Sequence, residues 1–213
     1  MNPNKAWWID TNFETVKKNL EARNFECFIV EKKEDVVPLL EKLISKGSVV
    51  SCGGSMTLFE CGVIDFLRNG NYSFLDRYKE GITPEELGEI YRKSFWADYY
   101  LMSTNAITLD GKLINIDGNG NRLAALLFGP KNVIVIAGKN KLVLNEEQGL
   151  LRVRNIASPM NSKRLSKNTP CTQDGKCHDC LSSDSICSHI VVTRRSPAKG
   201  RIKVVLVKED LGF

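Results

Sequence analysis

The sequence contains no long apolar segment. Its longest apolar stretch is Leu123–Phe128, and Val133–Ala137 has only the length of a buried strand. Both are far shorter than the roughly 20 residues that a helix needs to cross a bilayer. Residues 1–10 carry one lysine and no apolar core, so they lack the pattern of a secretory signal. We therefore expect a cytoplasmic protein without a membrane span.

The chain also lacks a large charge excess and any bias typical of fibrous or disordered proteins. Its 213 residues are 42% hydrophobic and 26% charged, with a net charge of +5. This composition excludes intrinsic disorder, collagen and coiled coil. The small positive charge is weak evidence for nucleic-acid binding, which we do not expect, but it suits an anionic small molecule. The length predicts one large domain, or one domain with an appendage.

The first third of the chain alternates between helical and extended patterns. Apolar residues at helical spacing predict helices over Lys5–Arg23, Asp35–Ser45 and Met56–Leu67, with short strands at Phe25–Val30 and Ser48–Ser51 between them. This rhythm is typical of a parallel sheet covered by helices. The predicted fold class is therefore α/β, with a mainly parallel sheet.

The middle of the chain continues the alternation and adds a hairpin. Asp110-Gly111 is a dipeptide favoured in type I′ turns, and apolar residues flank it on both sides. The predicted helices are Thr83–Phe95, Asn121–Phe128 and Asn145–Ile156, and the predicted strands are Asp98–Ser103, Ala106–Leu109, Lys112–Ile116 and Val133–Ala137.

The amino-acid composition becomes more polar after residue 156. We assign residues 1–213 to one domain, in which residues 157–189 form a polar, cysteine-rich excursion that binds metal. Residues 190–213 then supply closing strands, Ile190–Thr193 and Ile202–Val207, which we expect to form a pair and to return to the main sheet.

Four of the seven cysteines lie within this excursion: Cys171, Cys177, Cys180 and Cys187. In a cytosolic protein such a cluster favours metal or iron–sulfur ligation over disulfides. Four thiolates satisfy either tetrahedral zinc or a cubane, and we favour a [4Fe–4S] cluster with zinc as the alternative. The competing interpretation is a set of reduced surface thiols or redox-sensing disulfides. His178 and His189 are more simply bystanders, because four cysteines complete the coordination.

A glycine-rich turn follows the strand at Ser48–Ser51. Gly53 and Gly54 allow a sharp turn that directs backbone N–H groups at an anion, and Ser55 and Thr57 add hydroxyl groups. Glu60 follows one turn later and is the candidate catalytic nucleophile or base. The competing interpretations are a simple tight turn and a solvated glutamate.

A second polar loop precedes the helix at Asn121. It combines Asp117, Asn119, Asn121 and Arg122 with the earlier Asn105, a set that suits recognition of an anion by side chains and backbone. The competing interpretation is an Asn/Gly loop in which Asn121 only caps the helix.

These stretches together resemble the LUD (lactate-utilisation) domain family. The matching runs are Gly-Gly-Ser-Met-Thr-Leu at 53–58, the polar block at 103–122, Phe-Gly-Pro-Lys-Asn-Val-Ile-Val-Ile-Ala-Gly at 128–138, Thr-Pro-Cys at 169–171 and Glu-Asp-Leu-Gly-Phe at 209–213. The resemblance to LutC-like members implies a part in bacterial oxidation of lactate to pyruvate beside iron–sulfur partner proteins. The chain resembles a stand-alone form with its own four-cysteine segment.

A more remote resemblance is to the fold of ribose-5-phosphate isomerase, glucosamine-6-phosphate deaminase and the CoA transferases. By position it implies Ser55, Thr57 and Lys141 as ligand contacts. The acidic segment that the isomerase uses is replaced here by Thr104-Asn105-Ala106. Sugar-phosphate isomerisation would therefore lack its general base.

Three functions follow as hypotheses. The first is an iron–sulfur-associated redox component of lactate or hydroxy-acid metabolism that binds lactate, pyruvate, a sugar phosphate or a CoA ester. If it is an enzyme, it is an oxidoreductase component of lactate oxidation. The second is an isomerase-like or CoA-transferase-like enzyme with a structural metal, in which Glu60 acts. The third is a non-catalytic sensor of a metabolite or of redox state. A homodimer is also compatible with the sequence.

Overall fold

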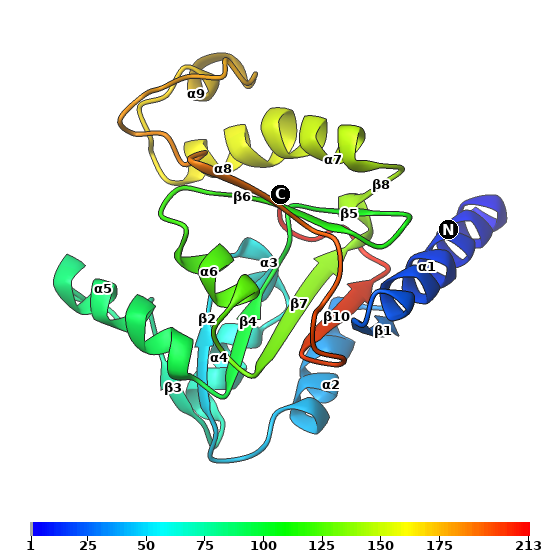
Figure 1. Cartoon of the computed structure of the whole chain (residues 1–213), viewed down its shortest axis with the longest axis horizontal. Coiled ribbons are helices and arrows are strands. Elements are labelled where there is room, and N and C mark those ends of the chain that lie inside the picture. Colours follow the sequence, from blue (N-terminus) through cyan, green and yellow to red (C-terminus); the bar gives the residue numbers. More distant parts are fainter. Residues whose placement is uncertain (1) are drawn as a thin grey trace.

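A parallel sheet of six strands forms the centre of the protein. The computed structural model describes residues 2–213 and is shown in Figure 1. Every neighbouring pair in this sheet is parallel, which confirms the predicted fold class. In spatial order the strands are β1 (Glu26–Val30), β10 (Ile202–Val207), β7 (Asn132–Gly138), β4 (Tyr99–Met102), β2 (Val49–Cys52) and β3 (Ser73–Leu75).

Helices cover both faces of this sheet. Alternate residues of β7 point to opposite sides, so Val133 and Val135 join one core while Ile134 and Ile136 join the other. The first core contains α1 and α6, and the second contains α2, α3 and α4. These helices are α1 (Pro3–Ala22), α2 (Val36–Leu43), α3 (Met56–Glu60), α4 (Val63–Asn69) and α6 (Asn121–Leu127).

A second sheet of four strands was not predicted. It begins from the expected hairpin, since β5 and β6 are antiparallel, and adds β9 beside β6 and β8 beside β5. The strands in order are β8 (Leu142–Val143), β5 (Ala106–Thr108), β6 (Leu113–Asp117) and β9 (His189–Thr193). In Figure 1 this small sheet lies above the carboxyl end of β7.

The remaining helices lie at the periphery. Helix α5 (Pro84–Lys93) begins with a capping box, in which Thr83 Oγ1 accepts from the Glu86 N–H and the Glu86 carboxylate accepts from the Thr83 N–H. Helices α7 (Glu146–Arg152) and α8 (Ser158–Arg164) are joined by a π-helical turn and lie across the small sheet, with α9 (Cys171–Asp174) beyond them (Figure 1).

The structure corrects several expectations. The helix predicted over Met56–Leu67 is two helices, because Gly62 adopts a φ of 68° that ends α3 and begins α4. The helix predicted to end at Ile156 continues through the π turn into α8. At the hairpin, Gly111 has a φ of 84° but Asp110 has no positive φ, so the turn is not type I′.

The two closing strands exist, but they do not form a pair. Strand β9 pairs with β6 in the small sheet, whereas β10 lies between β1 and β7 in the large one. The apolar run Ile202–Val207 is buried on both faces, which is the environment of a central parallel strand. The last part of the chain thus links the two sheets.

The length and hydropathy of each helix show whether it could span a membrane. Within residues 2–213, none of the helices is both long and apolar enough to traverse a bilayer.

The break at Gly62 gives the first testable prediction. We expect Gly62→Ala to lower the free energy of unfolding by about 1 kcal/mol, because an L residue is strained at this positive φ. Gly88→Ala in α5 is the matched control and should raise it by roughly 0.5–1 kcal/mol, since that glycine lies inside a helix. Urea unfolding measures both changes, and equal signs would contradict the account.

Candidate functional site

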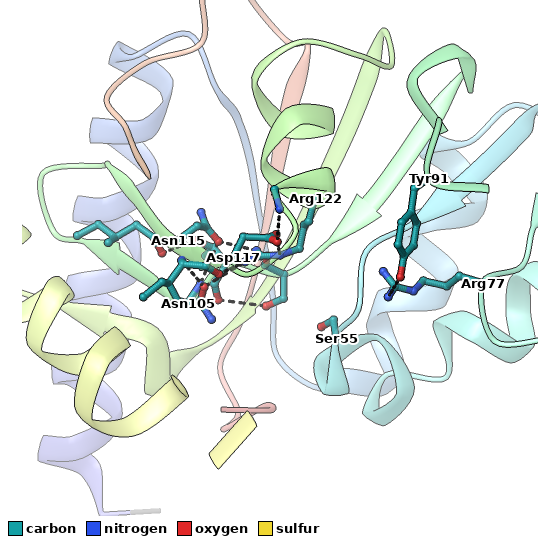
Figure 2. Close-up of polar contacts among 12 residues, drawn as sticks. Ser55, Arg77, Tyr91, Asn105, Asn115, Asp117 and Arg122 are labelled. Carbon is teal, nitrogen blue, oxygen red and sulfur yellow. Dashed lines mark hydrogen bonds and ion pairs between the residues drawn. The ribbon is translucent and has the colours of Figure 1, made fainter. Parts of the chain in front are cut away.

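A polar cleft lies where the large sheet, the small sheet and α8 meet. Its cavity volume is about 520 Å³. The turn after β2, the end of β4 and the loop before α6 all contribute walls, in agreement with the rule that parallel sheets bind ligands at the carboxyl ends of their strands. Figure 2 shows polar side chains from these segments around the cleft.

Arg122 holds one wall of the cleft together. Of the five N–H groups of its guanidinium, the four on Nη1 and Nη2 donate hydrogen bonds, and Nε lies in an ion pair. Burial lowers the pKa of Arg122, although the nearby Asp117 carboxylate opposes that shift. The acceptors are Asp117 Oδ2 at 3.3 Å from Nε, Ser103 O at 3.2 Å and Asn115 Oδ1 at 2.7 Å from Nη1, and Asn105 Oδ1 at 3.2 Å and Ile116 O at 2.7 Å from Nη2.

This network changes the role expected of Arg122. Because its donors are all engaged by the protein, the side chain fixes the loop before α6 and has no free edge for bidentate contact with a ligand. Asp117 is fixed in the same way, since Oδ1 also accepts from the Gly120 N–H at 2.9 Å. Gly53 permits the arrangement: a Cβ at that position would lie 2.9 Å from Arg122 Cδ.

Lys141 is the most deeply buried cation of the cleft. Only 3% of the residue is exposed, and Nζ donates to Thr57 Oγ1 at 3.1 Å and to Ser103 Oγ at 2.9 Å. An ammonium carries three donors, so one remains for a ligand. Burial, followed by the positive charges of Arg152 and Arg122, lowers the pKa of Lys141 to about 7, and the carboxylate of Glu60 opposes this shift.

A second group of cations lies on another wall. Arg77 donates from Nη2 to the Tyr91 hydroxyl at 2.7 Å, and its guanidinium lies 4.8 Å from the centre of the Tyr91 ring. Figure 2 shows this pair apart from the Arg122 network. Arg164 donates to Asn161 Oδ1 from two nitrogens, at 3.0 and 2.8 Å. Among residues 2–213, neither arginine forms an ion pair with a carboxylate.

The cysteine-rich segment also contributes to the cleft. Residues 183–186, between Cys180 and Cys187, line it. Asp184 ties this stretch to the chain after α8, because its carboxylate accepts from the Asn168 N–H at 2.8 Å and from Lys167 Nζ at 3.2 Å. The segment is therefore one wall of the site as well as the carrier of the four thiols.

The four thiols are unpaired, as are the three cysteines of the core. Burial raises the pKa of Cys187, and Cys177 and Cys171 are close enough to raise it further. In the part of the chain that the structure describes, no three His, Cys, Asp or Glu side chains are gathered closely enough to hold a metal. Four free thiols within residues 171–187 are the type of donor that zinc or an iron–sulfur cluster needs. Binding of a metal by these four cysteines stays a prediction.

Most of the predicted ligand residues meet at the cleft. Gly53 is not among the lining residues, because it supports Arg122 instead. Glu60 is not among them either: it is exposed, and its carboxylate accepts from the Gly212 N–H at 2.8 Å. The predicted residues that do line the cleft are Gly54, Ser55, Thr57, Asn105, Asp117, Asn119, Asn121, Arg122 and Lys141.

The sequence does not identify Arg77 and Arg164 as residues of the cleft. Arg77 follows β3, a strand too short to have been predicted, and it carries no motif that distinguishes it from other surface arginines. Arg164 and Lys167 were assigned to the excursion as part of a polar run. Their clue was the charge of that run, three basic residues within 163–167 without an acid.

The contacts of Arg122 predict that even a conservative substitution at this position destabilises the protein. We expect Arg122→Lys to lower the free energy of unfolding by about 2–4 kcal/mol, because an ammonium leaves buried acceptors unpaired. Arg92→Lys is the control, since the exposed Arg92–Glu89 pair contributes under about 1 kcal/mol. Denaturant unfolding compares the two, and similar losses would contradict the assigned role.

The shifted pKa of Lys141 makes stability depend on pH. Above pH 7 the folded lysine releases its proton while the unfolded lysine, with an ordinary pKa of 10.5, keeps it. The unfolded state then binds more protons, so stability rises with pH, by about 1–2 kcal/mol between pH 7 and 8.5. Lys141→Met should be more stable than the parent at pH 7 and should lack this rise, as urea unfolding at both pH values can test. An unchanged pH slope in the variant would contradict the buried-cation account.

Comparison with known proteins places the chain in a family. No curated protein matches the sequence. Among solved structures, it is similar to a DUF162 family protein from Deinococcus radiodurans, with 14% identity over 93% of this chain and 95% of the other and a TM-score of 0.46. Eukaryotic initiation factor subunit eIF2B beta from Chaetomium thermophilum has 13% identity over 52% and 39%, with a TM-score of 0.36. A variant of the decarboxylase AibA/AibB has 13% identity over 84% and 89%, with a TM-score of 0.35. The model of the LUD domain matches residues 13–207, nearly the whole chain, and the protein therefore belongs to the LUD domain family.

Proposed function

We propose that the protein binds a small anionic metabolite in this cleft and acts in the use of lactate or a related hydroxy acid. Membership of the LUD family supports a role associated with lactate utilisation. The observation that carries the ligand proposal is the set of cleft cations without acidic partners: Lys141, Arg77 and Arg164.

The charge of the cleft supports an anion over a neutral or cationic ligand. Its two acidic side chains are already paired, Asp117 with Arg122 and Asp184 with Lys167. The remaining cations have only neutral acceptors around them. Bringing a carboxylate or phosphate to a partly desolvated cation is favourable, since the attraction is less screened than in water. Lactate, pyruvate, a sugar phosphate and a CoA ester all carry such a group.

We further propose that Cys171, Cys177, Cys180 and Cys187 bind a [4Fe–4S] cluster, with zinc as the alternative. The support is chemical: four unpaired thiols lie within residues 171–187, and Arg154 contacts Cys177. A bound cluster would supply one-electron transfer and make the protein a redox component beside an iron–sulfur partner protein. Residues 157–189 would then be a metal-binding extension that also borders the ligand.

Binding of an anion is tested by calorimetry at pH 7 with pyruvate, lactate and inorganic phosphate as separate probes. We expect saturable binding of at least one of them. Lys141→Met should weaken the carboxylate probes, pyruvate and lactate, about tenfold or more, because one buried charge–anion contact contributes roughly 1.5–3 kcal/mol. Arg92→Met removes an exposed arginine of α5 outside the cleft and should leave the affinity unchanged. Absence of binding by all three probes, or equal loss in both variants, would contradict the proposal.

The metal proposal is tested by purifying the protein without oxygen and measuring iron, acid-labile sulfide and zinc. A brown protein with iron equal to sulfide supports the cluster, and a colourless protein with one zinc supports the alternative. Cys177→Ser with Cys180→Ser should remove the metal, whereas Cys61→Ser, in the apolar core, should retain it. Metal-free parent protein under these conditions would rule out both forms.

A further inference from the structure

The cations of the cleft fall into two groups that belong to different elements. Lys141 follows β7 and is held by Thr57 at the start of α3 and by Ser103 after β4. Arg77 and Arg164 come from the β3–α5 connection and from the end of α8. We call Lys141 with its two hydroxyls the inner group, and Arg77 with Arg164 the outer group.

Both arginines of the outer group line the cleft, and Tyr78 lies beside one of them. The Arg77 guanidinium lies 5.5 Å from the centre of the Tyr78 ring. Burial raises the pKa of Tyr78, and the positive charges of Arg77 and Arg164 oppose that rise. The Tyr78 hydroxyl in turn accepts from the Ser55 N–H at 3.3 Å, which places the outer group beside the glycine-rich turn.

The two groups are separated. Lys141 contacts Ser103, whose carbonyl oxygen accepts from Arg122, so the inner group lies beside the Arg122 network. Arg77 instead lies against the rings of Tyr78 and Tyr91. In Figure 2, Arg77 and Tyr91 lie on one side of Ser55, and the network of Arg122 and Asp117 lies on the other. A ligand that reaches both groups must therefore extend across the cleft.

The two groups also differ in chemistry. A guanidinium presents a planar fork that matches phosphate oxygens, and here Tyr91 and Asn161 hold the two forks in place before any ligand arrives. The inner group offers one ammonium donor between two hydroxyls, which suits the smaller carboxylate. A three-carbon monoacid carries one charge and fills only a small part of a cavity of about 520 Å³.

We infer that the ligand is a hydroxy or oxo acid that carries a phosphate at its other end, with the carboxylate at Lys141 and the phosphate between Arg77 and Arg164. The inference rests on the proposed function, because it names the ligand class of the same cleft. This inference is narrower than the proposed function, because it excludes lactate and pyruvate themselves as the best ligands. Both cation groups are then neutralised by one molecule.

The test uses 3-phosphoglycerate as a two-ended probe, with glycerate and inorganic phosphate as its single-ended halves. Calorimetry at pH 7 should show 3-phosphoglycerate binding at least about 30-fold more tightly than either half, because the second contact is made within one molecule. Lys141→Met should weaken glycerate and 3-phosphoglycerate but change phosphate by less than about threefold.

The outer group is tested by the reciprocal pattern. Arg164→Met, at an exposed position where folding is not at risk, and Arg77→Gln should each weaken phosphate and 3-phosphoglycerate and leave glycerate nearly unchanged. Arg92→Met is again the control outside the cleft. Thermal unfolding of each variant confirms that it is folded.

The outcomes separate this inference from the function it rests on. If glycerate or phosphate alone binds as tightly as 3-phosphoglycerate, or if all cleft variants weaken the three probes equally, the two-ended ligand is wrong while anion binding stands. If none of the three probes binds and lactate and pyruvate also fail, both proposals are overturned.

Discussion

The ion pair between Arg122 and Asp117 is the interaction on which the site depends. Arg122 projects from α6 and, through one guanidinium, binds the end of β4 and three residues of β6. It therefore joins the large sheet to the small one at the point where the cleft forms. A buried pair of this kind needs additional hydrogen bonds to offset its desolvation, and the two Nη groups of Arg122 make four of them.

Once the two sheets are fixed in this way, the position of Lys141 follows. The strand β7 carries the chain to the junction of the sheets, and a short 3₁₀ helix, Lys139–Lys141, places the ammonium between Thr57 and Ser103. The protein sustains a desolvated cation that no adjacent carboxylate neutralises. Such an arrangement reduces stability and is useful when an anion supplies the missing charge, a compromise that is typical of functional sites.

Part of this architecture was predictable from the sequence, because it rests on local patterns. Apolar runs of strand length, caps such as Thr83 and the Asp110-Gly111 turn specify elements within a few residues of themselves. Ser55, Thr57 and Lys141, which the resemblance to the isomerase fold implies as ligand contacts, all line the cleft. The long match of the LUD model agrees with that resemblance.

The remainder depends on contacts between residues distant in the chain. The separation of β9 from β10 into two sheets cannot be seen in either strand, since both are short and apolar. The hydrogen bonds of Arg122 cannot be predicted from the sequence either, because its acceptors include the backbone carbonyls of Ser103 and Ile116. The hydrogen bond that orients Arg77 in the cleft is accepted by Tyr91 of α5, 14 residues further along the chain.

The buried cation is measured most directly through the pKa of the Lys141 amine, followed by NMR in the free protein and in the presence of saturating 3-phosphoglycerate. We expect a pKa of about 7 in the free protein, and a rise of roughly one unit or more when an anion binds beside the ammonium. An ordinary lysine pKa near 10.5 in the free protein, or a value that the anion leaves unchanged, would contradict it.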